Sequence, residues 1–516
     1  MSNTSAFKPT LILHGGAGDI RRANLPPELY AKYQTSLHSY LRSTKDLLNN
    51  DATALDAAVH AVSLMEDDEL FNCGRGSVFT SSGSIEMEAS VMVTSVEENE
   101  RNPIPNQNQN QGLMKRGSAV SGLRNVRHPI RLARESLLRT GYDVNGKPNG
   151  DGGSMHMQLA APFVEERAKE WGLEFMPDEW FWTKARWEEH RRGLEGKDTA
   201  ASSFPSVVAQ ETVGCVCLDR WGGLAVATST GGSTNKWPGR TGDTPTMGAG
   251  FWAEAWDFID SAPSSSSPWR ELDGMDHIGG ETTGEPLLSS SQEPEQNNNM
   301  RSLFNGWMSS FVQKAVPNTN NTSTSTYTPV ATTDTEQSTA QQQNRAYIPE
   351  ESQTPSRRTK RRAVAMSGTG NGDSFLRVDA ARTASAMLRF SPRSSSSSSL
   401  SPPMSLSKAI TAMAGPNGEL QSSAGKRWGV TGEGSGGIIG IEAEVDKNPT
   451  PAAGEDYPSP VADRYYDDSD EEDILDRRQR GKVVFDFNCG GMFRAWVEED
   501  EDGVDVERVM VFREEY

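Results

Sequence analysis

Two threonines fall where a hairpin would bring them together. The segments "ETVGCVCLD" and "LAVATST" have the apolar pattern of two strands, and the "RWGG" between them permits a tight turn. If Asp219 pairs near Leu224, Thr212 lies roughly opposite Thr230 at one end of the sheet. A threonine at a strand start is often only a β-branched residue, but one hydroxyl supported by another could act as a nucleophile.

A cation and an anion follow the second strand, in the glycine-flanked loop "GRTGD". Arg240 offers a fork that suits a carboxylate, and Asp243 offers an acceptor for an ammonium group. Together they could bind the two charged ends of a free α-amino acid. The alternative from this motif alone is an ordinary surface ion pair.

A third candidate element is "AVAMSGTGNGDSFLRVDAA", residues 363–381, which reads as a strand, a glycine-rich turn and a helix. Successive glycine N–H groups at such a turn can form an anion-binding nest and hence an oxyanion hole. A phosphate loop is the alternative, although the Lys-Ser/Thr ending of nucleotide-binding loops is missing.

Compact α/β sequence must position these groups. An apolar strand covers Thr10–Gly18 and runs into glycines, and a helix with Thr53 as its N-cap follows. Pro129 begins another helix, with Gly141 at the position of its C-terminal cap.

Composition indicates long inserts within this framework. The chain has 516 residues, only 35% of them hydrophobic, with a formal charge of -20. Segments poor in core-forming residues cover about 97–112, 262–362, 391–405 and 446–473. We expect these to be disordered loops of one domain, because structured sequence resumes after each.

Two motifs lie within the largest insert. Residues 301–316, "RSLFNGWMSSFVQKAV", have helical spacing and could bind a protein partner, or could rest on their own domain. The basic run 356–362 resembles a nuclear-import signal, although such runs are also common in loops. Nuclear localisation is therefore an alternative to the cytoplasm.

The remaining composition excludes several classes. The acidic charge disfavours nucleic acid as a partner, and no apolar run is long enough to cross a membrane or serve as a signal peptide. Four cysteines in so long a chain form no disulfide framework; Cys215 and Cys217 share one strand face with Val213. We expect a soluble, cytoplasmic protein in which these thiols are buried.

The motifs taken in order resemble the plant-type L-asparaginase and isoaspartyl peptidase family of N-terminal nucleophile hydrolases. The resemblance is carried by "HGGAG", "FNCGRGSVFTSSGSIEMEASVM", "TVG", "TSTGGSTNKWPGRTGD" and "TGNGD". It implies an α+β fold, a four-layer αββα sandwich, made as an inactive precursor. Cleavage would give an α chain, 1–211, and a β chain, 212–516.

The resemblance also implies roles around the cleaved bond. Cleavage between Glu211 and Thr212 would free the amine of Thr212, which titrates near neutrality and can take the proton of its own hydroxyl. Thr230 would tune that hydroxyl, and Asn72 would assist near the scissile bond. The family usually has glycine or aspartate where this chain has Glu211, so slower self-cleavage is expected.

Further roles concern the substrate. Arg240 would hold the α-carboxylate and Asp243 the α-amino group, with Gly372 lining the site. Thr369 and the N–H of Gly370 would stabilise the oxyanion. The expected reaction releases aspartate from L-asparagine and β-aspartyl dipeptides.

No organic cofactor is implied, but a structural sodium ion is. Its ligands would be backbone carbonyls of one loop: Met65, Glu66, Asp68, Phe71, Cys73 and Arg75. The resemblance also suggests a dimer of αβ units.

Three alternatives stay open. "TGNGD" looks more like the glycosylasparaginase branch, although that substrate is made in the lysosome and the chain shows no signal peptide. The long inserts would suit a threonine aspartase that cuts proteins, but such enzymes usually lack an acid at the position of Asp243. From another class, the chain could be a non-catalytic interaction protein; loss of a site residue would favour this, and none is lost.

Overall fold

The described residues form one large sheet, one smaller sheet and a short strand pair. The computed structural model describes residues 7–96, 115–139, 156–196, 212–260, 358–391, 404–447 and 479–514. All belong to one compact unit made of residues 1–263 and 356–516. None of the helices in these ranges is long and apolar enough to cross a membrane.

The large sheet has eight strands, antiparallel except for the last pair. In spatial order they are β14 (Asp505–Met510), β13 (Gly491–Glu499), β2 (Thr10–Gly18), β6 (Val213–Leu218), β7 (Gly223–Thr230), β3 (Met87–Ser95), β4 (Arg116–Leu123) and β5 (Gln158–Ala160). The segments before and after Thr212 therefore contribute to the same sheet.

The smaller sheet has four antiparallel strands. Their order is β12 (Lys482–Phe487), β10 (Gly436–Asp446), β9 (Arg358–Gly370) and β8 (Phe251–Asp260). The short parallel pair joins β1 (Phe7–Lys8) and β11 (Gln479–Arg480).

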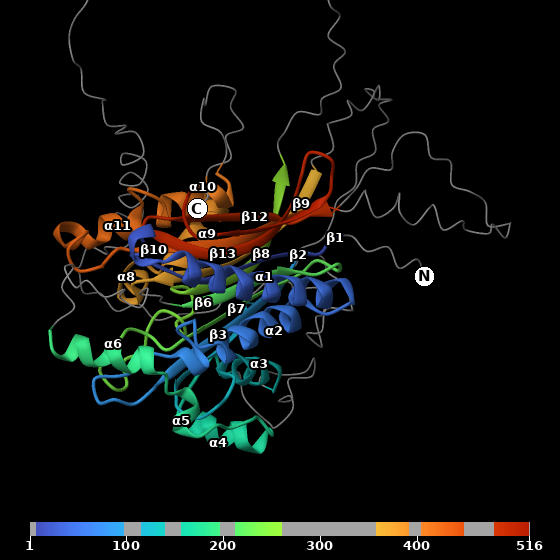
Figure 1. Ribbon diagram of the computed structural model, residues 1–516. Helices are drawn as coiled ribbons and strands as arrows, with labels where there is room; N and C mark the ends of the chain where they lie inside the picture. Colours follow the sequence, from blue (N-terminus) through green and yellow to red (C-terminus); the bar gives the residue numbers. More distant parts are fainter. Residues whose placement is uncertain are drawn as a thin grey trace, which may run out of the picture. The chain divides into compact units, whose positions relative to one another are not determined.

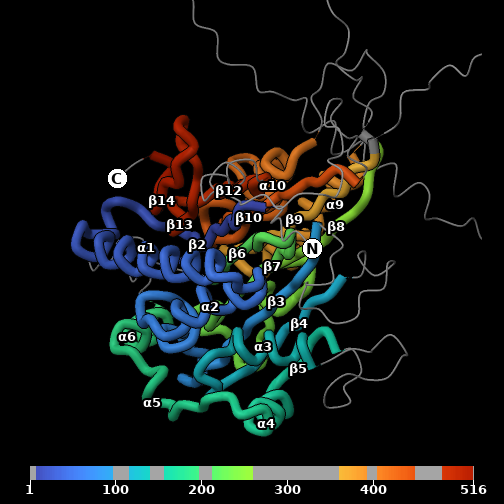
Figure 2. Tube along the Cα trace, turned by 90° about the vertical axis from the view of Figure 1, so that its right-hand side faces the viewer, coloured from blue at the N-terminus to red at the C-terminus, as the bar shows by residue number. Residues whose placement is uncertain are grey.

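Helices cover the outer faces of both sheets. Figure 1 shows α1 (Pro27–Asn49) and α2 (Ala54–Asp67) against the large sheet, and Figure 2 shows α9 (Ala380–Phe390) and α10 (Leu406–Ala414) on the side of the smaller one. The other helices are α3 (Pro129–Arg139), α4 (Phe163–Glu170), α5 (Asp178–Phe181), α6 (Lys184–Leu194), α8 (Gly372–Val378) and α11 (Glu419–Ala424), with 3-10 turns at Arg22–Asn24, Gly74–Gly76 and Gly425–Arg427.

The helices predicted after Thr53 and from Pro129 are present. α2 begins after Thr53, whose hydroxyl accepts from the Asp56 N–H at 3.1 Å, as a helix N-cap does. α3 begins at Pro129 as predicted, while Gly141 lies outside the described residues.

Two apolar layers alternate across each strand. Val213, Cys215 and Cys217 pack in the cluster that contains the leucines of α1 and α2, whereas Val216 and Leu218 pack with residues of the smaller sheet. This is the period-two pattern predicted for "ETVGCVCLD". Even-numbered residues of β6 therefore face the space between the sheets.

The largest insert connects two neighbouring strands. β8 and β9 are antiparallel, and Asp260 pairs with Arg358, so the chain leaves and returns at one point of the smaller sheet. The segment between them, the predicted helix 301–316 included, lies outside the described residues, as does the predicted loop 97–112.

The predicted end of this insert at residue 362 is wrong. β9 starts at Arg358, and Arg361 is buried with 2% of its surface exposed. A guanidinium nitrogen of Arg361 lies 3.6 Å from an Asp257 carboxylate oxygen, and one of Arg362 lies 3.1 Å from a Glu442 carboxylate oxygen. Most of the basic run 356–362 therefore belongs to a strand with acidic neighbours. Composition misses this because the partners lie far away in the sequence.

Replacing residues 263–355 with a short glycine-serine linker should leave the fold intact. Paired antiparallel residues have Cα atoms about 5 Å apart, so a tight turn can join Asp260 to Arg358. A shorter loop also has a smaller entropic cost of closure. We therefore expect a thermal midpoint of unfolding, measured by circular dichroism, equal to or above that of the full chain.

The matched control removes residues 263–362, which also deletes the start of β9 with Arg361. That variant should lose at least about 5 °C, since it removes buried strand pairing. Equal destabilisation by both deletions would show that the insert supports the fold.

Candidate active site

The hairpin of β6 and β7 sets the position of the central threonine. Leu218 pairs with Leu224 and Val213 pairs with Ser229, so one further step brings Thr212 opposite Thr230. The predicted register is therefore confirmed. Thr212, like Gly214, faces the space between the sheets.

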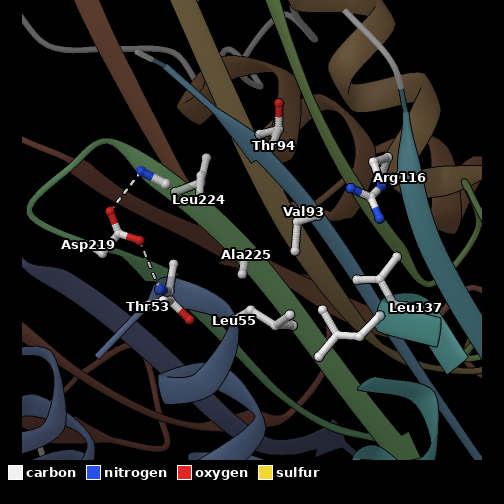
Figure 3. A pocket seen from close by; sticks show the side chains of 12 residues that line it. Thr53, Leu55, Val93, Thr94, Arg116, Leu137, Asp219, Leu224 and Ala225 are labelled. Atoms are coloured by element: carbon white, nitrogen blue, oxygen red, sulfur yellow. Dashed lines mark hydrogen bonds between the residues drawn. The ribbon is translucent and has the colours of Figure 1, made fainter. Parts of the chain in front are cut away.

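Asp219 fastens the turn of this hairpin to α2. Its carboxylate accepts from the N–H of Gly223 at 2.8 Å and from that of Ala54 at 2.9 Å (Figure 3). Burial raises the pKa of Asp219 to about 6, and these backbone bonds oppose the rise. The small cavity beside it, about 20 Å³, has room for a water molecule but not for an amino acid.

Thr212 is buried and contacts two other threonines. Its backbone N–H donates to Thr369 Oγ1 at 3.1 Å, and its Oγ1 lies 3.1 Å from Thr244 Oγ1. Thr369 Oγ1 also accepts from the N–H of Ala17 at 3.2 Å. Thr369 of β9 is therefore bonded through one oxygen both to Ala17 of β2 and to Thr212, the residue just before β6. Glu211 lies outside the described residues.

A neutral histidine, His14, lies beside Gly214, two residues along the chain from Thr212. His14 Nε2 and Ser367 Oγ are 2.7 Å apart, and both occupy the space over Gly214, where a Cβ atom would come within 2.1 Å of Ser367 Oγ. Burial lowers the pKa of His14 to about 3. His14 is therefore an uncharged packing group at neutral pH, and it holds the two sheets together beneath Thr212.

Thr230 and Asn72 organise the glycines that follow β7. Thr230 Oγ1 accepts from the Gly232 N–H at 2.9 Å. The Asn72 side-chain amide donates to the Gly232 carbonyl at 2.7 Å and accepts from the Val78 N–H at 3.0 Å. The backbone carbonyl of Asn72 accepts from the Gly231 N–H at 2.9 Å. These bonds fix the loop that leads toward Arg240.

Arg240, Asp243 and Gly372 lie close together. A Cβ atom on Gly372 would lie 2.5 Å from Asp243 Oδ1 and 3.0 Å from an Arg240 guanidinium nitrogen, so only glycine fits there. Arg240 is ion-paired at 3.0 Å with Asp373, whose side chain is 61% exposed. The ion pair of Arg240 with Asp373 is not predicted by the spacing of the two residues in the sequence.

Asp243 is a buried carboxyl group with one oxygen that accepts no hydrogen bond from the described residues. Its Oδ2 has no hydrogen-bond partner among the described residues, and burial raises its pKa to about 7, against the opposing charge of Arg240. A cationic ligand would relieve both conditions. Asp243 therefore suits an ammonium group.

A buried glutamate and a buried lysine lie beside this loop. Glu88 is opposite Thr230 on β3 and accepts from the Gly242 N–H at 3.0 Å. Burial raises the pKa of Glu88 and lowers that of Lys236, while each charge opposes the shift of the other. Neither residue was predicted from the sequence, because each is positioned by contacts with another segment: Glu88 with Gly242, and Lys236 with the Glu86 carbonyl.

Gly370 occupies a backbone position that a side chain would block. Its φ is +144°, and a Cβ atom would lie 2.4 Å from Gly436 Cα. Asn371 then caps α8 by accepting from the Ser374 N–H at 3.1 Å. The predicted strand, glycine turn and helix are confirmed, and the turn lies beside Thr369.

The predicted cation loop follows α2 and is tightly folded. The carbonyls of Met65, Asp68, Phe71 and Cys73 each accept one backbone N–H, which leaves each a second lone pair. The described residues contain no group of three His, Cys, Asp or Glu side chains that could hold a metal. The backbone carbonyls of this loop are groups that could bind a cation.

Comparison with known proteins shows the family of the chain. The family model described as asparaginase matches residues 7–100 and 110–257, a range that ends before β9. An isoaspartyl peptidase of Salmonella typhimurium is 33% identical over 48% of this chain and 70% of its own length. An isoaspartyl peptidase of Escherichia coli is 32% identical over 48% of this chain and 68% of its own length; for an isoaspartyl peptidase/L-asparaginase of Xenopus laevis the values are 32%, 48% and 67%. The chain belongs to this asparaginase family.

Proposed function

We propose that the chain is a self-processing threonine amidohydrolase that releases aspartate from L-asparagine and β-aspartyl peptides. The observation that carries this proposal is the contact of the Thr212 backbone nitrogen with Thr369 Oγ1 at 3.1 Å. It supports a site in which one residue supplies both nucleophile and base. We also infer that the two sheets and their helices form the αββα sandwich of N-terminal nucleophile hydrolases.

The first step is cleavage of the chain. Thr212 Oγ attacks the carbonyl carbon of residue 211, the C–N bond breaks, and the hydroxyl proton goes to the departing nitrogen. Water then hydrolyses the ester and leaves Thr212 with a free amine.

Hydrolysis of substrate uses that amine. An α-amine in a protein has a pKa near 8, so a large fraction is unprotonated at neutral pH. If it keeps its donor bond to Thr369 Oγ1, its lone pair is free to take the proton of Thr212 Oγ as that oxygen attacks the side-chain amide. The proton passes to the leaving ammonia or amine, and water hydrolyses the acyl-enzyme.

Two charged groups bind the substrate. Arg240 exchanges Asp373 for the substrate carboxylate, and the displaced Asp373 side chain, 61% exposed, returns to solvent. Asp243 Oδ2 accepts from the substrate ammonium. Thr369 O–H and Gly370 N–H stabilise the oxyanion, since donors aimed at a developing charge act most strongly in a buried site.

A sodium ion on the carbonyls after α2 would stiffen the loop that carries Asn72. We further propose a dimer of αβ units and cytoplasmic localisation, with the nucleus as the alternative compartment. Residues 301–316 remain a candidate segment for a protein partner.

The test is to incubate the purified protein and assay both reactions. A denaturing gel should show two chains divided before Thr212, and ammonia should be released from asparagine and aspartate from β-aspartyl dipeptides. Faster release from N4-(β-N-acetylglucosaminyl)-asparagine would favour a glycosylasparaginase, and cleavage of proteins alone a threonine aspartase. An uncut chain without any hydrolysis would leave only a non-catalytic role.

A further inference from the structure

The hydroxyl of Thr212, the proposed nucleophile, contacts a hydroxyl that the family resemblance did not imply. Thr244 Oγ1 lies 3.1 Å from Thr212 Oγ1, and both side chains are buried. Thr244 directly follows Asp243 in the chain, so one backbone turn carries both the proposed ammonium acceptor and this hydroxyl.

The position of Thr244 is fixed from behind. Its carbonyl accepts from Ser90 Oγ at 2.7 Å, and Ser90 Oγ lies 2.6 Å from Thr228 Oγ1. Ser90 and Thr228 are paired residues of β3 and β7. Thr244 is therefore tied to the same sheet that carries Thr212, with none of its surface exposed.

The chemistry of the attack decides which hydroxyl donates. Thr212 must give its own proton to a base, so the hydrogen between the two oxygens must come from Thr244. As negative charge develops on Thr212 Oγ, this bond becomes an O–H to oxyanion bond, which is about twice as strong as a neutral one.

We propose that Thr244 is a further catalytic residue that donates a hydrogen bond to Thr212 Oγ1 and activates it for attack. This inference rests on the proposed function. It gives the loop 243–244 two roles, because the residue that accepts the substrate ammonium is covalently joined to the one that activates the nucleophile. Thr230 Oγ1 accepts from the Gly232 N–H at 2.9 Å.

Thr244→Val keeps the branched shape and removes the hydroxyl. We expect kcat for asparagine to fall about 10- to 100-fold, the range for loss of one charge-assisted hydrogen bond, with KM within about twofold. Thr244→Ser should keep at least about a third of wild-type kcat. Rates are divided by the amount of cut β chain on a gel, so slower maturation does not enter the comparison.

Thr246→Val is the matched control. Thr246 lies in the same loop, but its Oγ1 donates to the Gly242 carbonyl at 2.8 Å and not to Thr212. It should retain kcat. The proposal is overturned if Thr244→Val retains kcat, if Thr244→Ser falls as far as Thr244→Val, or if the control falls equally. A wild type without hydrolysis would instead refute the proposed function.

Discussion

Thr212→Ala should give a single uncut chain and lower asparagine hydrolysis by at least about 10⁴-fold, the usual effect of removing a nucleophile. Alanine has no oxygen to attack the bond before it, and without cleavage no free amine forms. A denaturing gel and an ammonia assay on the same preparation measure both effects. The fold should remain, because Thr212 lies one residue outside the paired region of β6.

Thr212→Ser is the control for this experiment, since it retains a hydroxyl and should be cut, though more slowly. An alanine variant that is still divided before residue 212 would show that another group or a contaminating protease cuts the chain. An uncut alanine variant with full activity would mean that the nucleophile lies elsewhere.

Asp243→Asn should lower kcat/KM for asparagine by about 100-fold or more. The buried carboxylate is the proposed partner of the substrate ammonium, and loss of a buried charge partner costs about 2–5 kcal/mol. Asn keeps the shape but replaces one carboxylate oxygen with an NH2 donor and carries no charge. Steady-state kinetics across pH 5 to 9 give the result, and unchanged kinetics would remove Asp243 from the site.

The pH dependence of Asp243 has a definite sign. Its pKa of about 7 means that the carboxyl becomes protonated as pH falls through 7, so kcat/KM of the wild type should decline there. The Thr212 amine declines in the same direction, so the wild-type acid limb contains two ionisations and that of Asp243→Asn only one. Equal steepness in both proteins would contradict the assignment.

Folding stability should move in the opposite sense. The unfolded carboxyl ionises near pH 4 while the folded one keeps its proton to about 7, so this residue destabilises the fold as pH rises through that interval. Asp243→Asn should therefore be at least as stable as the wild type at pH 8. Thermal unfolding at pH 5 and 8 separates lost binding from lost folding.

Local patterns predicted the strand and turn geometry well. Thr212 faces Thr230 because a short turn fixes the register of a hairpin, and Asp219 anchors that turn. The cap at Thr53 and the glycine turn at Gly370 are equally local.

Contacts between distant segments were not predictable from spacing. Only the family resemblance predicted that Thr369 lies at the site. The sequence did not predict the ion pair of Arg240 with Asp373 or the contact of Thr244 with Thr212. The arginines from 358 to 362 were read as part of a loop for the same reason, because their acidic partners lie on β8 and β10.

The strand order of the large sheet has a consequence for how the mature protein can be assembled. β2, from the part before Thr212, lies between β13 and β6 from the part after it, and β3 pairs with β7. Cleavage before Thr212 would leave two polypeptides interleaved through many backbone hydrogen bonds, so that neither could leave without opening the sheet. Folding would be a unimolecular event only for the uncut precursor. Recovery of the cut protein from denaturant would require two chains to find each other, so its yield should depend on concentration, and its durability would be set by the rate of unfolding.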